Sequence, residues 1–415
     1  MTKAGAWPGS VGKGASRREV LAAAGLCATV VPVAGRAADI SGLRAAFPVA
    51  GTYFDAAFAH PLPTYAAEAA IAYTRERLRS PQAAGPRRNP RDLAVSRFAA
   101  LVNVASEDVA VVPSTMGGEN LLCAALGLGR QAGVLTDTSH YDASLVLYGE
   151  LARRGVPVAI VAPGAGGIDL AEYRRHLTPA TRLIAISLVS STTGLVHDLA
   201  GLCEMAHARG VLVYADIIQA AGAMPVDLKA SGVDFAGCGT YKWLMGEYGA
   251  AFLYVRPDRL ALLRRTEVGW RQLRRQTDAA HPATSPDPAI EPYTLRTDAV
   301  GLFEVSTPSW QALAIVAASL DGIARIGVDA IVRHREPLIA RLRSGLAEHG
   351  FQPLAPATSG PVLSFAVTDA ARRFTEPLAR EGITVSLYDQ RIRIAPSIYN
   401  SMDDVEHLIA TLAAN

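Results

Sequence analysis

The sequence predicts an α/β protein in which a mostly parallel, seven-stranded sheet is followed by a smaller α+β domain. Seven apolar, β-rich runs alternate with stretches of helical periodicity, the pattern of βαβ units with helices on both faces of a parallel sheet. The run 211–215 is almost continuously apolar, as a strand buried on both faces should be. Beyond residue 308 the pattern changes to a short α+β succession, which indicates a second domain.

The predicted elements follow one another in a regular order. The sheet strands are 109–112, 133–136, 157–161, 182–187, 211–215, 234–236 and 250–255. Helical stretches between them span 119–128, 143–153, 170–177 and 199–208. Residues 268–300 lack periodicity and predict a long functional loop. The C-terminal part is predicted as helix 308–326, helix 329–349, strand 361–367, helix 370–381, strands 383–387 and 391–395, and helix 402–413.

Length and composition limit the class of protein. A chain of 415 residues fits two domains, predicted at 39–307 and 308–415. Half of the residues are hydrophobic, 19% are charged, and the formal net charge is +2, so the chain is globular and gives no case for nucleic-acid binding. The four cysteines form neither a CxxC pair nor a metal-ligand spacing, so no metal site and no disulfide framework is expected: Cys27, Cys123, Cys203 and Cys238.

The first 38 residues have the pattern of an export signal. Arg17 and Arg18 form a twin-arginine pair before a mildly apolar stretch, and small residues follow at 35, 37 and 38. The stretch is too short and too weakly apolar to span a membrane. We therefore expect residues 1–38 to be a signal peptide for the twin-arginine translocase, which delivers folded proteins to the periplasm or another extracytoplasmic space. An amphipathic cytosolic leader is the alternative.

Two residues predict the chemistry. Asp216 ends a predicted buried strand, where α/β folds bind their ligands, and Lys242 follows the next strand. Pyridoxal 5′-phosphate (PLP) needs a lysine amine for its Schiff base and a carboxylate that keeps its pyridine nitrogen protonated. Taken singly, an aspartate after a strand is more often a helix cap and a lysine is usually solvated, so the prediction depends on the pair.

The surroundings of this pair resemble the class V aminotransferase family, which includes cysteine desulfurases, isopenicillin N epimerase-like enzymes and several carbon–sulfur lyases. The resemblance rests on residues 214–227 (YADIIQAAGAMPVD) and 239–256 (GTYKWLMGEYGAAFLYVR) and runs from about Phe47 to the C-terminus. It implies an aspartate-aminotransferase-like fold (fold type I), PLP as cofactor, and a homodimer whose active sites contain residues of both subunits.

The resemblance also assigns roles around the cofactor. His140 matches the histidine that stacks on the pyridine ring, with Tyr141 as the alternative if the alignment slips by one residue. Gln219 matches the residue that binds the phenolic oxygen, and Ser191 stands where relatives often carry Asn. A helix start suits a phosphate dianion. The residues expected there are Thr115, Met116 (where many relatives have Thr), Thr240, and Thr307 of the neighbouring subunit, although Thr307 could also be a helix N-cap.

Other matches concern the substrate. Arg393 matches the arginine that binds a substrate α-carboxylate by two parallel hydrogen bonds, which predicts an amino-acid-like substrate. Arg391 is the fallback on the same strand face, unless it is a solvated charge. Phe58 and His60 are candidates for side-chain recognition, with packing as the alternative role.

The reaction type stays open at this point. Lys242, displaced by the substrate amine, is the expected base for the Cα proton, and His140 the second catalytic candidate. Aminotransfer and β-elimination are favoured over epimerisation. Desulfuration through a persulfide is not expected, because residues 239–415 contain no cysteine and Cys238 is predicted to be a buried strand residue. A non-catalytic exported binding protein is the alternative from another class, whereas a dinucleotide oxidoreductase would need a GxGxxG motif that does not occur after the first strand.

Overall fold

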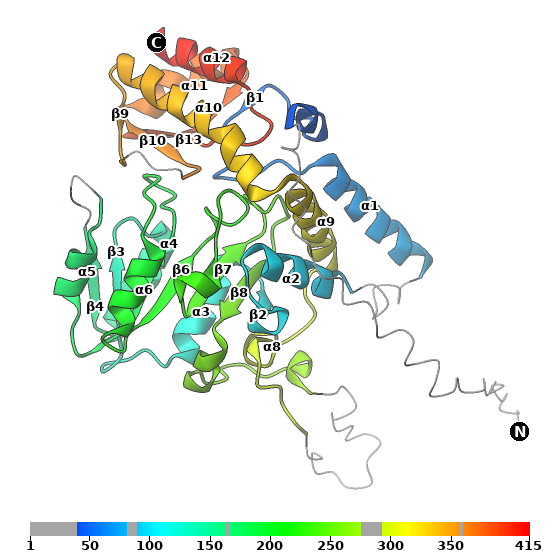
Figure 1. The fold of residues 1–415 in the computed structure, drawn as a ribbon, viewed down its shortest axis with the longest axis vertical. Coiled ribbons are helices and arrows are strands. Elements are labelled where there is room, and N and C mark those ends of the chain that lie inside the picture. Colours follow the sequence, from blue (N-terminus) through cyan, green and yellow to red (C-terminus); the bar gives the residue numbers. More distant parts are fainter. Residues whose placement is uncertain (1–39, 81–88, 163, 165–166, 275–292, 357–359) are drawn as a thin grey trace, which may run out of the picture. The chain divides into compact units, whose positions relative to one another are not determined.

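The computed structural model describes residues 40–80, 89–162, 164, 167–274, 293–356 and 360–415 (Figure 1). The predicted signal peptide lies outside the described residues, as does the part 275–292 of the predicted loop. Within the described residues, no helix has the length and apolar character that crossing a membrane requires.

A seven-stranded sheet forms the larger layer, as predicted. Its spatial order is β2-β8-β7-β6-β5-β3-β4, and only β8 runs antiparallel to its two neighbours. The strands β7 and β8 are joined by a short connection, which suits an antiparallel pair because a parallel pair needs a crossover of a dozen residues or more. The strands are β2 (Val109–Val112), β3 (Gly133–Asp137), β4 (Val158–Val161), β5 (Thr181–Ser187), β6 (Leu212–Asp216), β7 (Phe235–Gly239) and β8 (Ala251–Val255).

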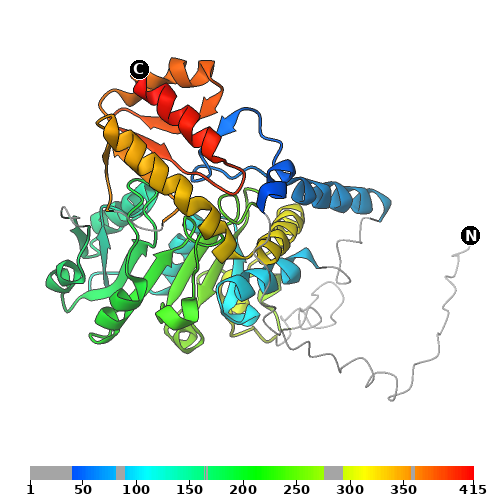
Figure 2. The same ribbon diagram turned by 45° about the horizontal axis from the view of Figure 1, so that its top comes forward.

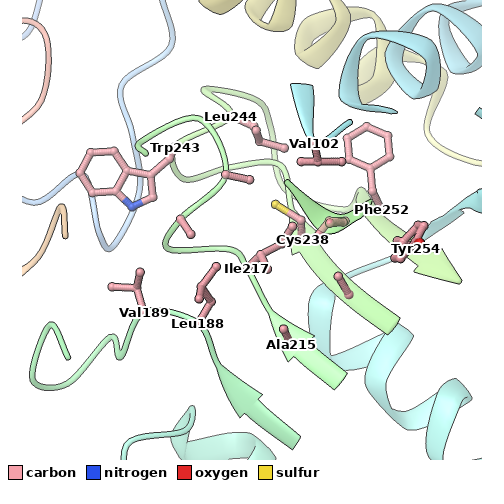
Figure 3. Close-up of a cluster of buried hydrophobic side chains, with 14 of the residues drawn as sticks. Val102, Leu188, Val189, Ala215, Ile217, Cys238, Trp243, Leu244, Phe252 and Tyr254 are labelled. Carbon is pink, nitrogen blue, oxygen red and sulfur yellow. The ribbon is translucent and has the colours of Figure 1, made fainter. Parts of the chain in front are cut away.

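Helices cover both faces of this sheet, and each face has its own core. Successive strand residues point to opposite faces, so Val111 and Val213 join one buried cluster while Val112 and Leu212 join the other. Figure 3 shows part of the first cluster, where the side chains of Ile217, Cys238 and Phe252 gather above the strands. The helices between the strands are α3 (Thr115–Ala125), α4 (Asp142–Arg153), α5 (Leu170–His176), α6 (Leu199–His207) and α7 (Leu228–Ser231).

Three further helices extend the first core. The helix α9 (Trp310–Ile326) packs against α1 (Thr64–Arg79) and α2 (Pro90–Leu101), and its apolar residues belong to the first cluster (Figures 1 and 2). Ser309 caps α9 by accepting a hydrogen bond from Ala312 N. The alternative reading of Thr307 as the helix N-cap is therefore wrong. Short helical turns complete this part at Ile40–Ala46, Ser106–Asp108, Pro257–Leu262, Trp270–Gln272 and α8 (Ala299–Phe303).

The C-terminal residues build the smaller α+β layer. A four-stranded sheet of order β12-β13-β10-β9 packs with three helices around a separate cluster that includes Leu342, Phe365 and Leu408. Among the C-terminal residues this cluster begins inside α10, at Leu338, while the predicted domain boundary at 307/308 stays a prediction. The elements are α10 (Val328–Glu348), β9 (Gln352–Pro353), β10 (Leu363–Ala366), α11 (Ala370–Arg380), β11 (Ile383–Thr384), β12 (Ser386–Tyr388), β13 (Arg391–Ile394) and α12 (Met402–Ala413).

The N-terminal segment belongs to this second core. The strand β1 (Thr52–Tyr53) pairs in parallel with β11, and Phe54 is fully buried in the second cluster. Gly51 allows this pairing, because a side chain there would come within 2.2 Å of Gly382 O. The predicted single strand 383–387 therefore divides into β11, which pairs with β1, and β12, which pairs with β13.

Candidate active site

A cavity of about 220 Å³ opens at the carboxyl ends of β5 and β6, the edge where α/β sheets bind ligands. It brings together six of the predicted site residues, namely Thr115, Met116, Ser191, Asp216, Gln219 and Lys242. The remaining lining comes from Ser114, Tyr141, Ser187, Ile218 and Tyr241.

Lys242 lies in the connection between β7 and β8 and is 8% exposed. A tight turn holds it, because Met245 N donates to Lys242 O at 2.8 Å while Met245 itself has a left-handed φ of 55°. Ser319 on α9 donates to Met245 O at 2.7 Å and fixes the turn to the first core. Burial lowers the pKa of Lys242 to about 8, although the nearby charge of Asp216 opposes this shift. The amine is thus more readily available in its neutral, nucleophilic form than that of an ordinary lysine.

Asp216 is the last residue of β6 and is almost completely buried. Its Oδ1 accepts a hydrogen bond of 2.9 Å from Ile218 N, which leaves Oδ2 for another donor. Burial raises the pKa of Asp216 to about 6, against the opposing effects of the Ile218 N–H, His140 and Lys242. A buried carboxylate with this environment gains from a cationic partner such as a protonated ring nitrogen.

His140 is fully buried in a polar network just behind the cavity. Its Nδ1 lies 2.9 Å from Ser187 Oγ and its Nε2 lies 3.3 Å from Glu119 Oε1. Burial lowers the pKa of His140, but the hydrogen bond and the charge of Glu119 outweigh this and hold the pKa above its usual value. Ser187 and Tyr141 line the cavity whereas His140 does not, so both the stacking role of His140 and the alternative of Tyr141 stay predictions.

Glu119 is a residue that the sequence analysis did not single out. It lies on α3 and also accepts hydrogen bonds from Ser144 Oγ, at 2.7 Å, and from Tyr148 OH. These contacts and His140 together lower its pKa, although burial alone would raise it. The available signal was a charged residue within an apolar helix, which a single sequence does not distinguish from a solvated one.

The start of α3 has the features of a phosphate site. Ser114 caps this 11-residue helix by accepting from Gly117 N at 2.9 Å, so other N–H groups of the first turn stay open. Among the described residues, the Thr115 Oγ1 is buried and has no hydrogen-bond partner. An orphaned donor at a helix start fits a phosphate dianion. The hydroxyl of Thr240 instead donates to backbone carbonyls, at 3.0 Å for Ala250 O, and Thr240 does not line the cavity.

Gln219 connects the cavity to two neighbouring segments. Its Nε2 donates to Ala57 O at 2.9 Å, and its Oε1 accepts from Trp243 Nε1 at 2.8 Å. An amide nitrogen carries two donors, so one N–H remains for a ligand such as a phenolic oxygen. The predicted contact therefore stays compatible with the structural role of the side chain.

The structure does not bring three other predicted residues to this cavity. Both ring nitrogens of His60 have internal partners at 2.8 Å, Pro61 O and Ser397 Oγ, and burial lowers its pKa to about 4. The side chain of Phe58 is 61% exposed and lies outside the lining. Thr307 lines a separate cavity of about 430 Å³, which also contains Gly117 of α3. Their predicted contacts with substrate or cofactor stay predictions.

The two arginines of β13 lie next to the cavity without lining it. Arg393 Nη1 donates to the backbone oxygen of Ser191, a lining residue, at 3.2 Å. Its Nη2 is held by Asp55 and Ser386, at 3.1 and 2.8 Å. The Arg391 guanidinium stacks on the ring of Tyr388, 3.7 Å from its centroid.

A lysine and a carboxylate at one buried cavity, with an anion-accepting helix start beside them, fit PLP, and together with the fold they define the class of fold type I PLP enzymes. The chain belongs to the class V aminotransferase family, whose model (Aminotransferase class-V) matches residues 92–408. PLP is the cofactor of this family.

Individual relatives agree with this membership. The chain is 28% identical to an uncharacterized aminotransferase (YcbU) of Bacillus subtilis strain 168, over 78% of this chain and 83% of the relative. It is 27% identical to isopenicillin N epimerase of Streptomyces clavuligerus, over 74% and 79%. The solved structure of the cysteine desulfurase CsdA from Escherichia coli has the same fold, with a TM-score of 0.77 at 20% identity over 90% of this chain and 97% of that one.

Proposed function

We propose that this protein transforms an amino-acid-like substrate at Cα or Cβ, as an aminotransferase or a β-lyase. The observation that carries the proposal is the meeting of Lys242 and Asp216, both buried, in one cavity next to the start of α3. Bound there, PLP supplies an electron sink for negative charge that develops at the substrate Cα.

The residues of this chain have distinct tasks in that reaction. Lys242 would hold the cofactor through its Nζ, and the same amine, once free, would accept the Cα proton. Asp216 keeps the pyridine nitrogen protonated through its open Oδ2. Thr115 and the first turn of α3 bind the phosphate, and Gln219 orients the ring through its remaining N–H. Glu119 stabilises the cationic form of His140, which would add positive charge behind the cavity.

Persulfide chemistry is not part of the proposal. It needs a thiol that can reach the substrate, and Cys238 is fully buried in β7 as predicted. Burial raises the pKa of this thiol far above its usual value, so the reactive thiolate is suppressed. No cysteine follows Cys238 in the sequence.

Product analysis tests the reaction type. The holoenzyme is incubated with a panel of amino acids and cysteine S-conjugates. A 2-oxo acid that appears only with a second 2-oxo acid as amino acceptor identifies an aminotransferase, whereas pyruvate, ammonia and a free thiol in equal amounts identify a β-lyase. Racemised substrate without other products would support an epimerase instead. Persulfide and alanine from cysteine would contradict the exclusion of a desulfurase.

We propose that the enzyme acts outside the cytoplasm. The support is the twin-arginine pattern at Arg17 and Arg18, which fits a cofactor enzyme that folds before transport. In a bacterium with a twin-arginine translocase, we expect the protein in the periplasmic fraction and the double variant Arg17→Lys, Arg18→Lys in the cytoplasm. A matched pair at Arg153 and Arg154 on the body of the protein should not change the distribution. The proposal would be contradicted if the Arg17→Lys, Arg18→Lys variant, like the control variant, were found in the same fraction as the wild type.

A homodimer with shared active sites is the third part of the proposal. Its support is the match of Thr307 to a residue that reaches the neighbouring subunit's phosphate, together with the separate cavity that Thr307 lines with Gly117 of α3. We expect light scattering on the purified holoenzyme to give twice the mass of one chain. A second measurement mixes inactive Lys242→Ala with inactive Thr307→Ala chains, because heterodimers would regain one intact site. A monomeric mass would rule out the shared site.

A further inference from the structure

Arg393 carries an internal counterion. Its Nη2 donates to Asp55 Oδ1 at 3.1 Å, and the two side chains are only 6% and 9% exposed. Ser386 joins them, because its Oγ accepts from Nη2 at 2.8 Å and donates to the Asp55 carboxylate at 2.7–2.8 Å. The predicted carboxylate-binding arginine is therefore already paired with a carboxylate of its own chain.

The contacts of this pair engage Nη2, the guanidinium nitrogen that both bidentate edges share. A carboxylate approaches a guanidinium along the Nε–Nη2 edge or the Nη1–Nη2 edge, and each edge uses one Nη2 hydrogen. Asp55 Oδ1 and Ser386 Oγ both accept from Nη2, while Nε is buried without a partner among the described residues. A ligand carboxylate that is to be held by two parallel bonds therefore has to compete with Asp55 and Ser386 for Nη2.

The negative charge of Asp55 opposes the binding of a carboxylate to Arg393, as its hydrogen bond to Arg393 does. Asp55 contacts Arg393 directly, and its charge also acts on Lys242 in the cavity. A substrate carboxylate on Arg393 and the Asp55 carboxylate carry like charges. With little water between them, they repel each other by far more than they would in bulk solvent. Asp55 therefore weakens the anion site that Arg393 would otherwise provide.

We propose that Asp55 is a competing internal carboxylate that the substrate's α-carboxylate displaces from Arg393, and that this exchange limits how tightly the site binds carboxylates. The inference rests on the proposed PLP function and deepens it, because it makes Asp55 and Ser386 determinants of substrate selectivity. A pure support role for Asp55 predicts the opposite sign, since removal of a support would weaken carboxylate binding.

Two stable conjugates separate these roles. Phosphopyridoxyl-L-alanine and phosphopyridoxyl-ethylamine, the reduced adducts of PLP with an amine, differ only in the carboxylate. Each is titrated calorimetrically into the full chain after removal of PLP. The ratio of the two affinities measures the contribution of the carboxylate, independently of turnover.

We expect Asp55→Asn to raise this ratio roughly tenfold over the wild type, because the amide keeps the shape of the side chain and removes its charge. Ser386→Ala should raise it less, by about threefold, through release of one Nη2 hydrogen. Ser364→Ala is the matched control, because Ser364 and Ser386 both lie directly opposite Arg393 on neighbouring strands, while Ser364 Oγ has no partner among the described residues. Its ratio should equal that of the wild type.

Other results overturn the proposal at different levels. If the ratio of the two affinities falls or stays constant in Asp55→Asn, the exchange is contradicted. If that variant does not unfold cooperatively on heating, the ratio in Ser386→Ala decides instead, and a fall or no change contradicts the exchange. Equal binding of the two conjugates by the wild type shows that the carboxylate is not recognised, which sinks the exchange but leaves the PLP site intact. Failure of both conjugates to bind the wild type contradicts the proposed function itself.

Discussion

Replacing Lys242 with alanine is expected to abolish covalent attachment of PLP and to lower turnover by on the order of 10³-fold or more, since one side chain serves as both anchor and base. The chain makes the measurement unusually clean, because it contains only four lysines: Lys3, Lys13, Lys229 and Lys242. Borohydride reduction of the wild type should leave the cofactor on the peptide that contains Lys242, and mass spectrometry should find no labelled peptide in the variant.

The control for this experiment is Lys229→Ala. Lys229 lies exposed on α7, so the variant should keep the visible absorption band of the bound cofactor and its full turnover. The low pKa of Lys242 adds a pH dependence, because attachment requires the neutral amine. The rate at which the cofactor-free protein captures PLP should rise with pH and level off above about 8. A wild type that stays colourless with added PLP would contradict the enzyme assignment.

Asp216→Asn is expected to have opposite effects on activity and on stability. Asparagine cannot balance a protonated pyridine nitrogen, so turnover should fall by roughly 10²–10³-fold, as when one preorganised electrostatic contact is removed. Asp216→Glu keeps the charge and should lose less. Steady-state kinetics with saturating PLP checks both values, and unchanged turnover in Asp216→Asn would contradict the assigned role.

The stability effect follows from the pKa of Asp216. Burial raises this pKa to about 6 from an ordinary value of 3.8, so the folded cofactor-free protein favours the protonated form. The stability that this group contributes at low pH is therefore lost as the pH rises from about 4 to about 6. Asp216→Asn has no such loss, and its cofactor-free form should melt a few degrees above the wild type at pH 7 and no higher at pH 4. A lower melting temperature at pH 7 would indicate that the carboxylate supports the fold.

Much of the sheet and part of the site follow from local sequence patterns. The buried strands have continuous apolar runs, and Asp216 and Lys242 follow two of them, so their meeting at one edge is a consequence of parallel topology. Ser114 shows the limit of the same reasoning. The helical stretch was predicted from residue 119, but α3 begins at Thr115, where Ser114 caps it, and the two glycines at 117 and 118 hid the helical pattern.

The contacts that the sequence did not predict join segments far apart in the chain. Glu119 lies on α3 and His140 follows β3. No periodicity in either segment indicates that the two side chains share a buried space. Histidine is a residue type that often binds ligands, but the ring of His60 packs between Phe47, Trp243 and Tyr399. Asp55 carries no local signal of its role, since its partner Arg393 lies 338 residues later.

The pairing of β1 with β11 can form only late in the synthesis of this protein. Ser386, the serine bound to Asp55, is 331 residues further along the chain. At about 5–20 residues per second, the ribosome needs roughly 17–66 seconds to supply it. During that time β1 and the carboxylate of Asp55 have no partners, because β11 and Ser386 have not yet been synthesised. A chain cut short before β11 lacks Ile383 and all later residues of the cluster that buries Phe54, such as Ile392 and Leu408, so only a chain translated beyond α12 completes both its smaller core and the anion site.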